Sequence, residues 1–406
     1  MQTKKPVVWI FNQFAGTPDS GWGERHYFFA QHWIKEGWEV VIFSGSFNHV
    51  FKKNVKVKSG FYEEENYQGV RFVWVKNPKY NPQSVMRFVS MLIFTFRLFF
   101  MGFKKFSKPK SIVVSSMPIF PILPALYFKW MFKIPVIFEI RDIWPLTLIH
   151  LGNVKSWHPL VLFIGWFEKL AYRKSDKVVS LLPNAQKHVE AVAKKSVDFH
   201  YIPNGIDENL VGFEDIPKDL EELIPKDRFI VGYAGTIGLA NALEHFVDAA
   251  LSFTYDEGIS FLIVGDGYLK EELMLKCANS GHVLLYPKIK KAQIQNLLTY
   301  FDVAFVGRAG TALFSHGVSA NKYFDYMLAG LPILDSNNLI KDPVELSGCG
   351  LLVEPDSTYA IVEGIKRLST ISKEDRKNLG ESGRKYVLSK HSIAQLSLIY
   401  SRNFGS

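Results

Sequence analysis

The sequence contains little cysteine and no internal repeat. Only Cys277 and Cys349 occur among 406 residues, which excludes a disulfide framework and a cysteine-based metal site. The absence of short-period repeats and of low-complexity segments excludes solenoid and disordered architectures. Because such cysteine usage is typical of a reducing compartment, we expect a cytoplasmic protein.

Acidic residues are missing from a long part of the chain. Between Asn66 and Phe138 there is no Asp or Glu. The same stretch contains eleven basic residues, namely Arg71, Lys76, Lys79, Arg87, Arg97, Lys104, Lys105, Lys108, Lys110, Lys129 and Lys133. The whole chain has a formal net charge of +9. A surplus of this sign suits an anionic partner such as nucleic acid, a phosphorylated substrate or an acidic membrane face.

Residues 87–108, inside the acid-free stretch, are rich in Phe, Leu and Met. A spanning helix needs about 20 predominantly apolar residues, and Arg97 interrupts this run, so a span is the weakest interpretation. Two others stay open: a core helix of an α/β domain, and an interfacial helix with basic residues toward lipid phosphates. Residues 157–167 have the same ambiguity. Our hypothesis is that residues 87–108 hold the protein peripherally on the anionic inner face of the membrane.

Short β-rich runs alternate with helical segments along the whole chain. Continuous apolar runs of this length suit strands buried on both faces of a parallel sheet. The candidate strands are 6–11, 39–44, 70–75, 111–116, 135–140 and 177–182, then 228–235, 259–267, 282–287, 302–307, 331–336 and 350–355. The alternation predicts an α/β fold with two Rossmann-like doubly wound domains facing a cleft.

The pattern weakens between residues 184 and 228, where acids, prolines and turn formers are frequent. We therefore predict a first domain at 1–190 and a second at 191–385. A C-terminal helix, 386–406, is expected to cross back to the first domain. In open α/β sheets ligands bind beyond the carboxyl ends of the strands, so the residues of interest are those that follow strands.

Glycine-rich turns follow several predicted strands. Gly16 and Gly23 precede a helix that we expect to start near Glu24, and residues 235–238 connect a strand to a helix in the second domain. A flexible turn that leads into a helix N-terminus favours phosphate oxygens. The spacing of these glycines differs from the full dinucleotide fingerprint, and ordinary turn chemistry is the alternative.

Two charged residues follow the predicted strand 135–140. Arg141 and Asp142 are expected at the carboxyl end of the sheet, beside the cleft. A carboxylate there would orient an acceptor hydroxyl or support positive charge at a reacting carbon. The alternative is a surface pair of opposite charges.

The segment GVSANKYFDYMLAGLPI, residues 317–333, predicts a single helix capped by Ser319 or Asn321. The N-terminus of a helix attracts anions through its free N–H groups and its dipole. Lys322 would add a charge for a diphosphate, and Asp325, one turn on, would accept the hydroxyls of a ribose. A local Lys–Asp pair at a spacing of three is the alternative.

Four segments occur in the order seen in a known family: YIPNGID, GYAGTIGLANALEHFVDAA, FLIVGDG and GVSANKYFDYMLAGLPI. They resemble the second domain of GT-B fold retaining glycosyltransferases of family 4. NQFAGTPDSGWGERHYFFAQHWIKEGWEVVI and RDIWP resemble the subgroup that builds O-antigen and capsular polysaccharides. The resemblance implies transfer of a hexose or N-acetylhexosamine, with retention, to a lipid-linked saccharide. The donor would be a nucleotide-diphosphate sugar, with UDP favoured, and neither a cofactor nor a metal is expected.

The resemblance also implies roles for individual residues. Those expected to bind the nucleotide sugar are Gly16, Gly23, Gly235, Thr236, Gly238, Pro287, Lys288, Ile289, Ser319, Asn321 and Asp325. The catalytic candidates are Asp142, which falls near the histidine of many relatives, Lys322 and Arg308. On the acceptor side we expect Glu24, Arg25, His26 and Arg141.

The sequence departs from the family pattern at two places. Gly317 occupies the position of the first of two family glutamates, and Leu239, Ala240 and Asn241 stand where many relatives have an Arg and a Lys. Arg308 and Lys322 would replace that charge. Two alternatives remain: a nucleotide-sugar 2-epimerase on the same fold, and a non-catalytic basic protein for lipid or nucleic acid. We expect no nucleic-acid partner.

Overall fold

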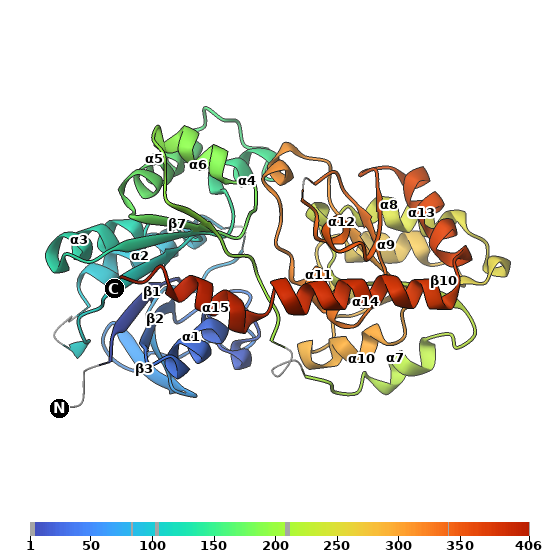
Figure 1. The fold of residues 1–406 in the computed structure, drawn as a ribbon, viewed down its shortest axis with the longest axis horizontal. Helices are drawn as coiled ribbons and strands as arrows, with labels where there is room; N and C mark the ends of the chain where they lie inside the picture. The colour runs from blue at the N-terminus through green and yellow to red at the C-terminus, as the bar shows by residue number, and fades with distance from the viewer. Residues whose placement is uncertain (1–4, 83, 102–104, 208–211, 340, 406) are drawn as a thin grey trace. The chain divides into compact units, whose positions relative to one another are not determined.

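The computed structural model describes residues 5–82, 84–101, 105–207, 212–339 and 341–405 (Figure 1). The chain forms two compact units. The first comprises Met1–Pro203 together with Ile393–Ser406, and the second comprises Asn204–Ser392.

The first unit is built on an eight-stranded sheet with the order β3-β4-β2-β1-β5-β6-β7-β8. Its strands are β1 Val7–Phe11, β2 Glu39–Gly45, β3 Tyr62–Tyr67, β4 Val70–Val75, β5 Ser111–Ser115, β6 Val136–Ile140, β7 Lys177–Ser180 and β8 Phe199–Tyr201. Only the edge strand β3 pairs in the antiparallel sense within the described residues. The central strands β1, β5 and β6 are buried along their whole length, as the apolar runs predict.

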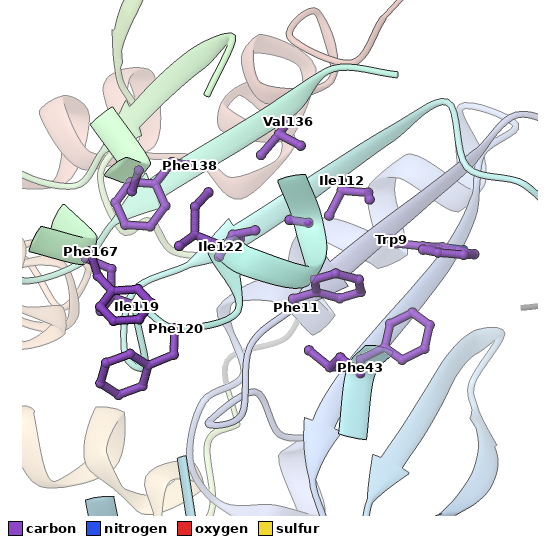
Figure 2. Close-up of a cluster of buried hydrophobic side chains, with 14 of the residues drawn as sticks. Trp9, Phe11, Phe43, Ile112, Ile119, Phe120, Ile122, Val136, Phe138 and Phe167 are labelled. Atoms are coloured by element: carbon purple, nitrogen blue, oxygen red, sulfur yellow. The ribbon is translucent and has the colours of Figure 1, made fainter. Parts of the chain in front are cut away.

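Helices cover both faces of this sheet (Figure 1). They are α1 Arg25–Lys35, α2 Val85–Phe99, α3 Ile122–Phe132, α4 Trp144–His150, α5 Pro159–Lys174, α6 Gln186–Ala193 and α15 Ile393–Ser401. Helices α2, α3 and α5 pack on one face through a cluster that includes Trp9, Phe11 and Phe120, which Figure 2 shows in close-up. Helices α1 and α15 cover the other face.

The second unit is built on a six-stranded sheet, parallel throughout its described residues, with the order β11-β10-β9-β12-β13-β14. Its strands are β9 Phe229–Thr236, β10 Ile259–Asp266, β11 Val283–Tyr286, β12 Val303–Gly307, β13 Ile333–Ser336 and β14 Gly350–Val353. Its helices are α7 Lys218–Leu223, α8 Leu243–Ser252, α9 Lys270–Cys277, α10 Ile294–Leu298, α11 Asn321–Leu328, α12 Pro343–Ser347, α13 Thr358–Thr370 and α14 Lys373–Lys390. The prediction of two Rossmann-like α/β domains is thus confirmed.

Two strands escaped the sequence analysis. β3 has the sequence YEEENY and is largely exposed, because it forms the edge of the sheet and its acids face solvent. β8 is only three residues long. The predicted division after residue 190 falls inside α6, whereas the first unit continues to Pro203 because β8 pairs with β7.

The last residues of the chain belong to the first unit. α15 packs on α1, where the indole Nε1 of Trp33 donates to the backbone oxygen of Ser397 at 2.9 Å. α14 lies in the second unit, where Gly380 approaches the backbone oxygen of Gly330 so closely that a Cβ would stand 1.7 Å from it. The chain thus passes from the second unit to the first between Ser392 and Ile393, and the helices on either side pack within their own units.

The apolar segment 87–108 coincides in part with α2, and residues 102–104 lie outside the described ranges. Met91, Phe94 and Leu98 are buried against the core, so one face of α2 is a core face. Among the residues that the structure describes, no helix is long and apolar enough to cross a bilayer.

Candidate functional site

Lys322 lies in the first turn of α11, next to the end of β9. Its Nζ donates to the hydroxyl of Tyr233 at 2.9 Å and to Oδ1 of Asn241 at 2.7 Å. The same Nζ stands 4.4 Å from the centre of the Tyr233 ring, a cation–π distance. Burial lowers the pKa of Lys322 well below its usual value, and the charge of Arg308 lowers it further, although Asp335 opposes the shift.

Arg308 follows β12 and points at the same amide. Its Nη1 donates to Oδ1 of Asn241 at 3.1 Å, and its side chain is buried. The Nε of Arg308 has no hydrogen-bond partner. Among the described residues neither Arg308 nor Lys322 forms an ion pair with a carboxylate, and Asp335 acts on Lys322 only through its charge. Two cations therefore share one neutral oxygen, which leaves positive charge available for an anion.

The sequence analysis did not identify Tyr233 and Asn241 as site residues. The Nδ2 of Asn241 donates to the backbone oxygen of Thr236 at 2.9 Å, and the Tyr233 hydroxyl donates to the same oxygen at 2.6 Å. These bonds fix the loop after β9 and hold Lys322 in place. Asn241 was visible only as a departure from the family pattern, because its partners come from distant parts of the chain.

The glycines of this region allow strand ends to approach one another. A Cβ at Gly265 would stand 1.9 Å from the backbone oxygen of Gly235, and one at Gly267 would stand 1.9 Å from that of Ile237. At Gly238 a Cβ would meet the Tyr268 ring at 3.3 Å. Close packing therefore explains glycine at positions 265 and 267. Gly235 lies at the end of β9 next to Lys322, whose Cε would stand 3.5 Å from a Cβ at Gly235.

The N-terminus of α11 differs from the expected capping. The helix begins at Asn321, and its N-cap residue is Ala320, so the predicted caps Ser319 and Asn321 are wrong. Ser319 is held instead by Asn204, whose backbone N–H donates to the Ser319 hydroxyl at 2.7 Å. The Asn204 side chain also donates to the backbone oxygen of Ser319, again at 2.7 Å.

Asn321 is exposed and Asp325 is half-buried one turn further along α11. The backbone oxygen of Asp325 accepts a hydrogen bond from the Gln295 side chain at 3.0 Å. Gly317, which precedes the helix, has φ +91°, a conformation that side chains rarely adopt. Backbone geometry thus accounts for glycine at the position where the family pattern has its first glutamate.

Pro287, Lys288 and Ile289 follow β11 at the edge of the sheet. β11 stands three places from β12 in the strand order, so these residues are set apart from Arg308. Lys288 is exposed, with its Nζ 4.0 Å from a carboxylate oxygen of Asp266. They remain predicted contacts of a nucleotide base.

In the first unit, Arg25 and His26 are buried around Glu139. The Nε of Arg25 lies 3.2 Å from Glu139 Oε2, and the His26 Nε2 lies 3.0 Å from Oε1. The Arg25 guanidinium also donates to the backbone oxygens of Ile202 and Pro203, at 2.7 and 2.6 Å. Arg25 and His26 thus have a structural role in the first unit. Their predicted contact with the acceptor would come in addition to that role.

The other predicted residues of the first unit lie closer to the surface. Asp142 is exposed, and Arg141 is half-buried with its backbone N–H donating to Ser116 Oγ at 3.0 Å. Glu24 is half-buried at the start of α1.

Gly16 and Gly23 close the loop that precedes α1. The N–H of Gly16 donates to the backbone oxygen of Gly23 at 3.1 Å. Gly23 has φ +78°, and a Cβ there would stand 2.0 Å from the oxygen of Phe14. Both glycines are required by the loop itself, and their proposed contact with donor or acceptor remains a prediction.

His391 lies against the far side of α11. Its ring is 4.6 Å from that of Phe324 and 5.4 Å from that of Tyr386, and its Nδ1 is 3.3 Å from the backbone oxygen of Asn204. Burial lowers the pKa of His391 to about 4, although the bond to Asn204 opposes the shift. The neutral ring thus donates from Nδ1 to the carbonyl.

The lowered pKa predicts that acid destabilises the second unit. The unfolded ring titrates near pH 6.5, so the unfolded state binds a proton first as the pH falls. The stabilisation is complete above that pH and is lost between about pH 6.5 and 4, a change of about 3 kcal/mol. We expect the melting temperature of His391→Phe to depend less on pH in this range than that of the wild type. The exposed His158, replaced by Asn, is the control, and equal pH slopes for His391→Phe and the wild type would contradict the prediction.

Within the described ranges no group of three or more His, Cys, Asp or Glu side chains is placed to hold a metal ion. Cys277 and Cys349 are both free and buried.

Two family models match the chain. The model described as Glycosyltransferase Family 4 matches residues 24–210, and the model described as Glycosyl transferases group 1 matches residues 215–386. The comparison with curated proteins gave no match.

Solved structures match along nearly the whole chain. Sucrose-phosphate synthase from Thermosynechococcus elongatus is similar with a TM-score of 0.72 at 16% identity, over 98% of both chains. HepE of Anabaena, in complex with UDP and glucose, gives 0.68 at 12% identity, also over 98% of both chains. WaaG, a glycosyltransferase involved in lipopolysaccharide biosynthesis, gives 0.65 at 14% identity over 98% of this chain and 100% of WaaG. At such identities the likeness shows the fold.

These findings define the class as an enzyme of GT-B architecture. The chain is a glycosyltransferase, with a Glycosyltransferase Family 4 domain followed by a glycosyl transferases group 1 domain.

Proposed function

We propose that this enzyme transfers a hexose or N-acetylhexosamine from a UDP-sugar to a lipid-linked saccharide, with retention of configuration. The observation that carries the proposal is the pair of cations, Lys322 and Arg308, that converge on Asn241 without a carboxylate partner among the described residues. A diphosphate supplies the negative charge that this pair lacks.

The two cations would stabilise the diphosphate more strongly as it leaves than while it is still bonded to the sugar. When the bond between the anomeric carbon and the β-phosphate oxygen breaks, its electron pair stays on the diphosphate, whose negative charge increases. Cations and helix N-termini that are already fixed stabilise that charge without reorganising. Tyr233 and Asn241 fix Lys322 in this way.

The acceptor hydroxyl oxygen forms the new bond to the anomeric carbon. Its proton passes to the departing phosphate oxygen on the same face of the sugar, which gives retention and needs no further base. Asp325 would accept the ribose hydroxyls, and Asp142 would orient the acceptor hydroxyl. Support for UDP comes from relatives of the same fold, since HepE is described in complex with UDP-glucose and an Escherichia coli trehalose-6-phosphate protein with UDP-2-fluoro glucose.

A role in bacterial surface polysaccharide biosynthesis is supported by two observations. WaaG, which shares the fold, is involved in lipopolysaccharide biosynthesis, and the first unit has a basic, acid-free stretch that suits the anionic inner face of a membrane. A cytoplasmic enzyme held peripherally there would meet lipid-linked acceptors.

A donor panel tests the proposal. We expect UDP-sugars to raise the melting temperature of the wild type more than GDP- or dTDP-sugars do. Asn241→Asp places a carboxylate between the two cations, so it should form ion pairs with them, although it loses the hydrogen bond that the Asn241 amide donates to the backbone oxygen of Thr236. The same change should weaken donor binding at least about tenfold, because the diphosphate must displace that carboxylate.

Asn241→Ala is the matched control, since it removes the shared oxygen without adding charge and should weaken binding less than Asn241→Asp. Donor binding by Asn241→Asp at the wild-type affinity would exclude this place for the diphosphate.

A further inference from the structure

The first unit exposes an unusual number of large apolar side chains on α2, α3 and α5 and in the residues next to their ends. We define the aromatic surface as Val85, Met86, Leu92, Phe96, Phe100, Tyr127, Trp130, Met131, Trp157, Leu162, Phe163 and Trp166, each at least 36% exposed. Three of the four tryptophans that are exposed to this degree belong to it, with Trp130 at 77%. Single exposed apolar residues are ordinary, but a contiguous group marks a surface for a partner or a membrane.

α2 is apolar on the side that faces away from the core. Its core face is formed by Met91, Phe94 and Leu98, while Leu92 and Phe96 stand on the outer side at helical spacing. Arg87 and Arg97 are the only charged residues in the helix. A surface helix of a soluble domain normally presents polar residues to water. A second apolar face on α2 therefore indicates that another surface covers it in the functional state.

The three helices are neighbours, which makes their outer faces one surface. The ring of Phe99 on α2 is 5.8 Å from Tyr127 on α3, and Phe88 on α2 is 6.2 Å from Phe163 on α5. All three helices pack on the same face of the sheet (Figure 1). The aromatic surface therefore extends across one side of the unit.

Basic residues lie beside the aromatic surface. The Nζ of Lys108 lies 5.8 Å from the Phe132 ring, and that of Lys155 lies 5.9 Å from the Trp157 ring. Lys133 and Arg173 are exposed at the C-terminal ends of α3 and α5. The carboxylate of Asp176 is engaged by Lys129 at 2.7 Å and by the Val136 backbone N–H at 2.8 Å. The sequence from Asn66 to Phe138 contributes no acid.

We propose that the aromatic surface, formed jointly by α2, α3 and α5, docks the enzyme on an anionic bilayer. Tryptophan and tyrosine favour the level of the lipid head groups, and phenylalanine and leucine enter the acyl boundary beneath them. Lysine and arginine beside them attract anionic lipids. A second copy of the chain would bring the same basic residues together, so charge favours the bilayer over a dimer.

The docking surface deepens the proposed function, since it would place the first unit where lipid-linked acceptors reside. Vesicle binding by itself requires no donor and no acceptor. The two proposals can therefore fail separately.

Vesicle flotation at low salt tests the docking. We expect the full chain to float with vesicles that contain phosphatidylglycerol and to bind phosphatidylcholine vesicles at least about tenfold more weakly, with binding to the former falling as salt rises. All nine tryptophans lie in the first unit, so brominated lipids that quench tryptophan fluorescence report on this unit alone.

The double variant Trp130→Ser, Trp166→Ser tests the location. Both indoles are exposed, so the change should leave the melting temperature unaltered while binding to anionic vesicles falls at least about tenfold. The matched control is Leu275→Ser, Tyr359→Ser, which removes two large side chains of the second unit that are at least as exposed on average as the two indoles. This variant should bind vesicles like the wild type.

Three results would overturn the proposal. They are absence of flotation by the wild type, equal flotation by the tryptophan variant, and a stable dimer in light scattering that the tryptophan variant converts to monomer. Protection by UDP-sugars in the thermal-shift assay would be unchanged in each case, which separates failure of docking from failure of the proposed function.

Discussion

Replacing Lys322 by alanine is expected to lower turnover about 100-fold, because it removes a fixed cation from the departing diphosphate. The reason lies in its partners: Lys322 donates to a neutral hydroxyl and a neutral amide, so its charge is not committed to a carboxylate. The chain should stay folded, since burial works against the charged ammonium and lowers its pKa.

The measurement is UDP release from the UDP-sugar that gives the largest thermal shift, with a bacterial lipid extract as the source of acceptor. Lys366→Ala is the matched control, because Lys366 lies on α13 and pairs with Glu363 at 3.6 Å; it should keep the wild-type rate. Tyr233→Phe loses only one of the hydrogen bonds to Lys322, so its rate should lie between the rates of Lys322→Ala and Lys366→Ala. A wild-type rate in Lys322→Ala would remove Lys322 from the mechanism.

The fold was accessible from the sequence because its strands are long apolar runs. Twelve predicted strands correspond to strands of the two sheets. For the central strands, burial on both faces leaves a continuous apolar run in the sequence. β3 was missed for the opposite reason, because an exposed edge strand with three glutamates carries no such signal. β8, with three residues, is too short to form a pattern.

The candidate site was accessible only in part. Lys322 stood out through its place at a helix start, and Arg308 was proposed as a replacement charge. That both would meet at one amide oxygen could not be foreseen, because Asn241 is 67 and 81 residues away from them in sequence. Asn204, which holds Ser319, is separated from it by 115 residues. In both cases the residues come together only through the tertiary fold, which the local sequence pattern does not reveal.

Replacing Arg25 by methionine should destabilise the first unit by about 3–5 kcal/mol, because it leaves the fully buried Glu139 without its strongest counter-charge. Burial raises the pKa of Glu139, but the charges of Arg25, His26 and Arg141 outweigh burial and the net pKa is lowered. The guanidinium carbon of Arg25 lies 4.6 Å from the centre of the Phe29 ring. Methionine has a similar apolar length but no charge, so the loss reports on the charge, its hydrogen bonds and this cation–π contact.

Urea unfolding followed by tryptophan fluorescence measures this loss, since all nine tryptophans lie in the first unit. Arg71→Met is the control: Arg71 also pairs with a glutamate, Glu64, at 2.7 Å, but both side chains are about one third exposed. A surface pair of this kind contributes about 0–1 kcal/mol. Burial, not pairing as such, is therefore expected to decide the size of the effect.

Lowering the pH should reduce the difference in the free energy of unfolding between Arg25→Met and the wild type. A carboxylate with a lowered pKa stabilises the fold above its unfolded value, near pH 4.3, and this stabilisation is lost as the pH falls through the folded pKa. The double variant Arg25→Met, Glu139→Gln should recover part of the loss at pH 7, because it removes the uncompensated charge. Equal losses in Arg25→Met and Arg71→Met, or no recovery in the double variant, would mean that Glu139 finds its compensation elsewhere in the fold.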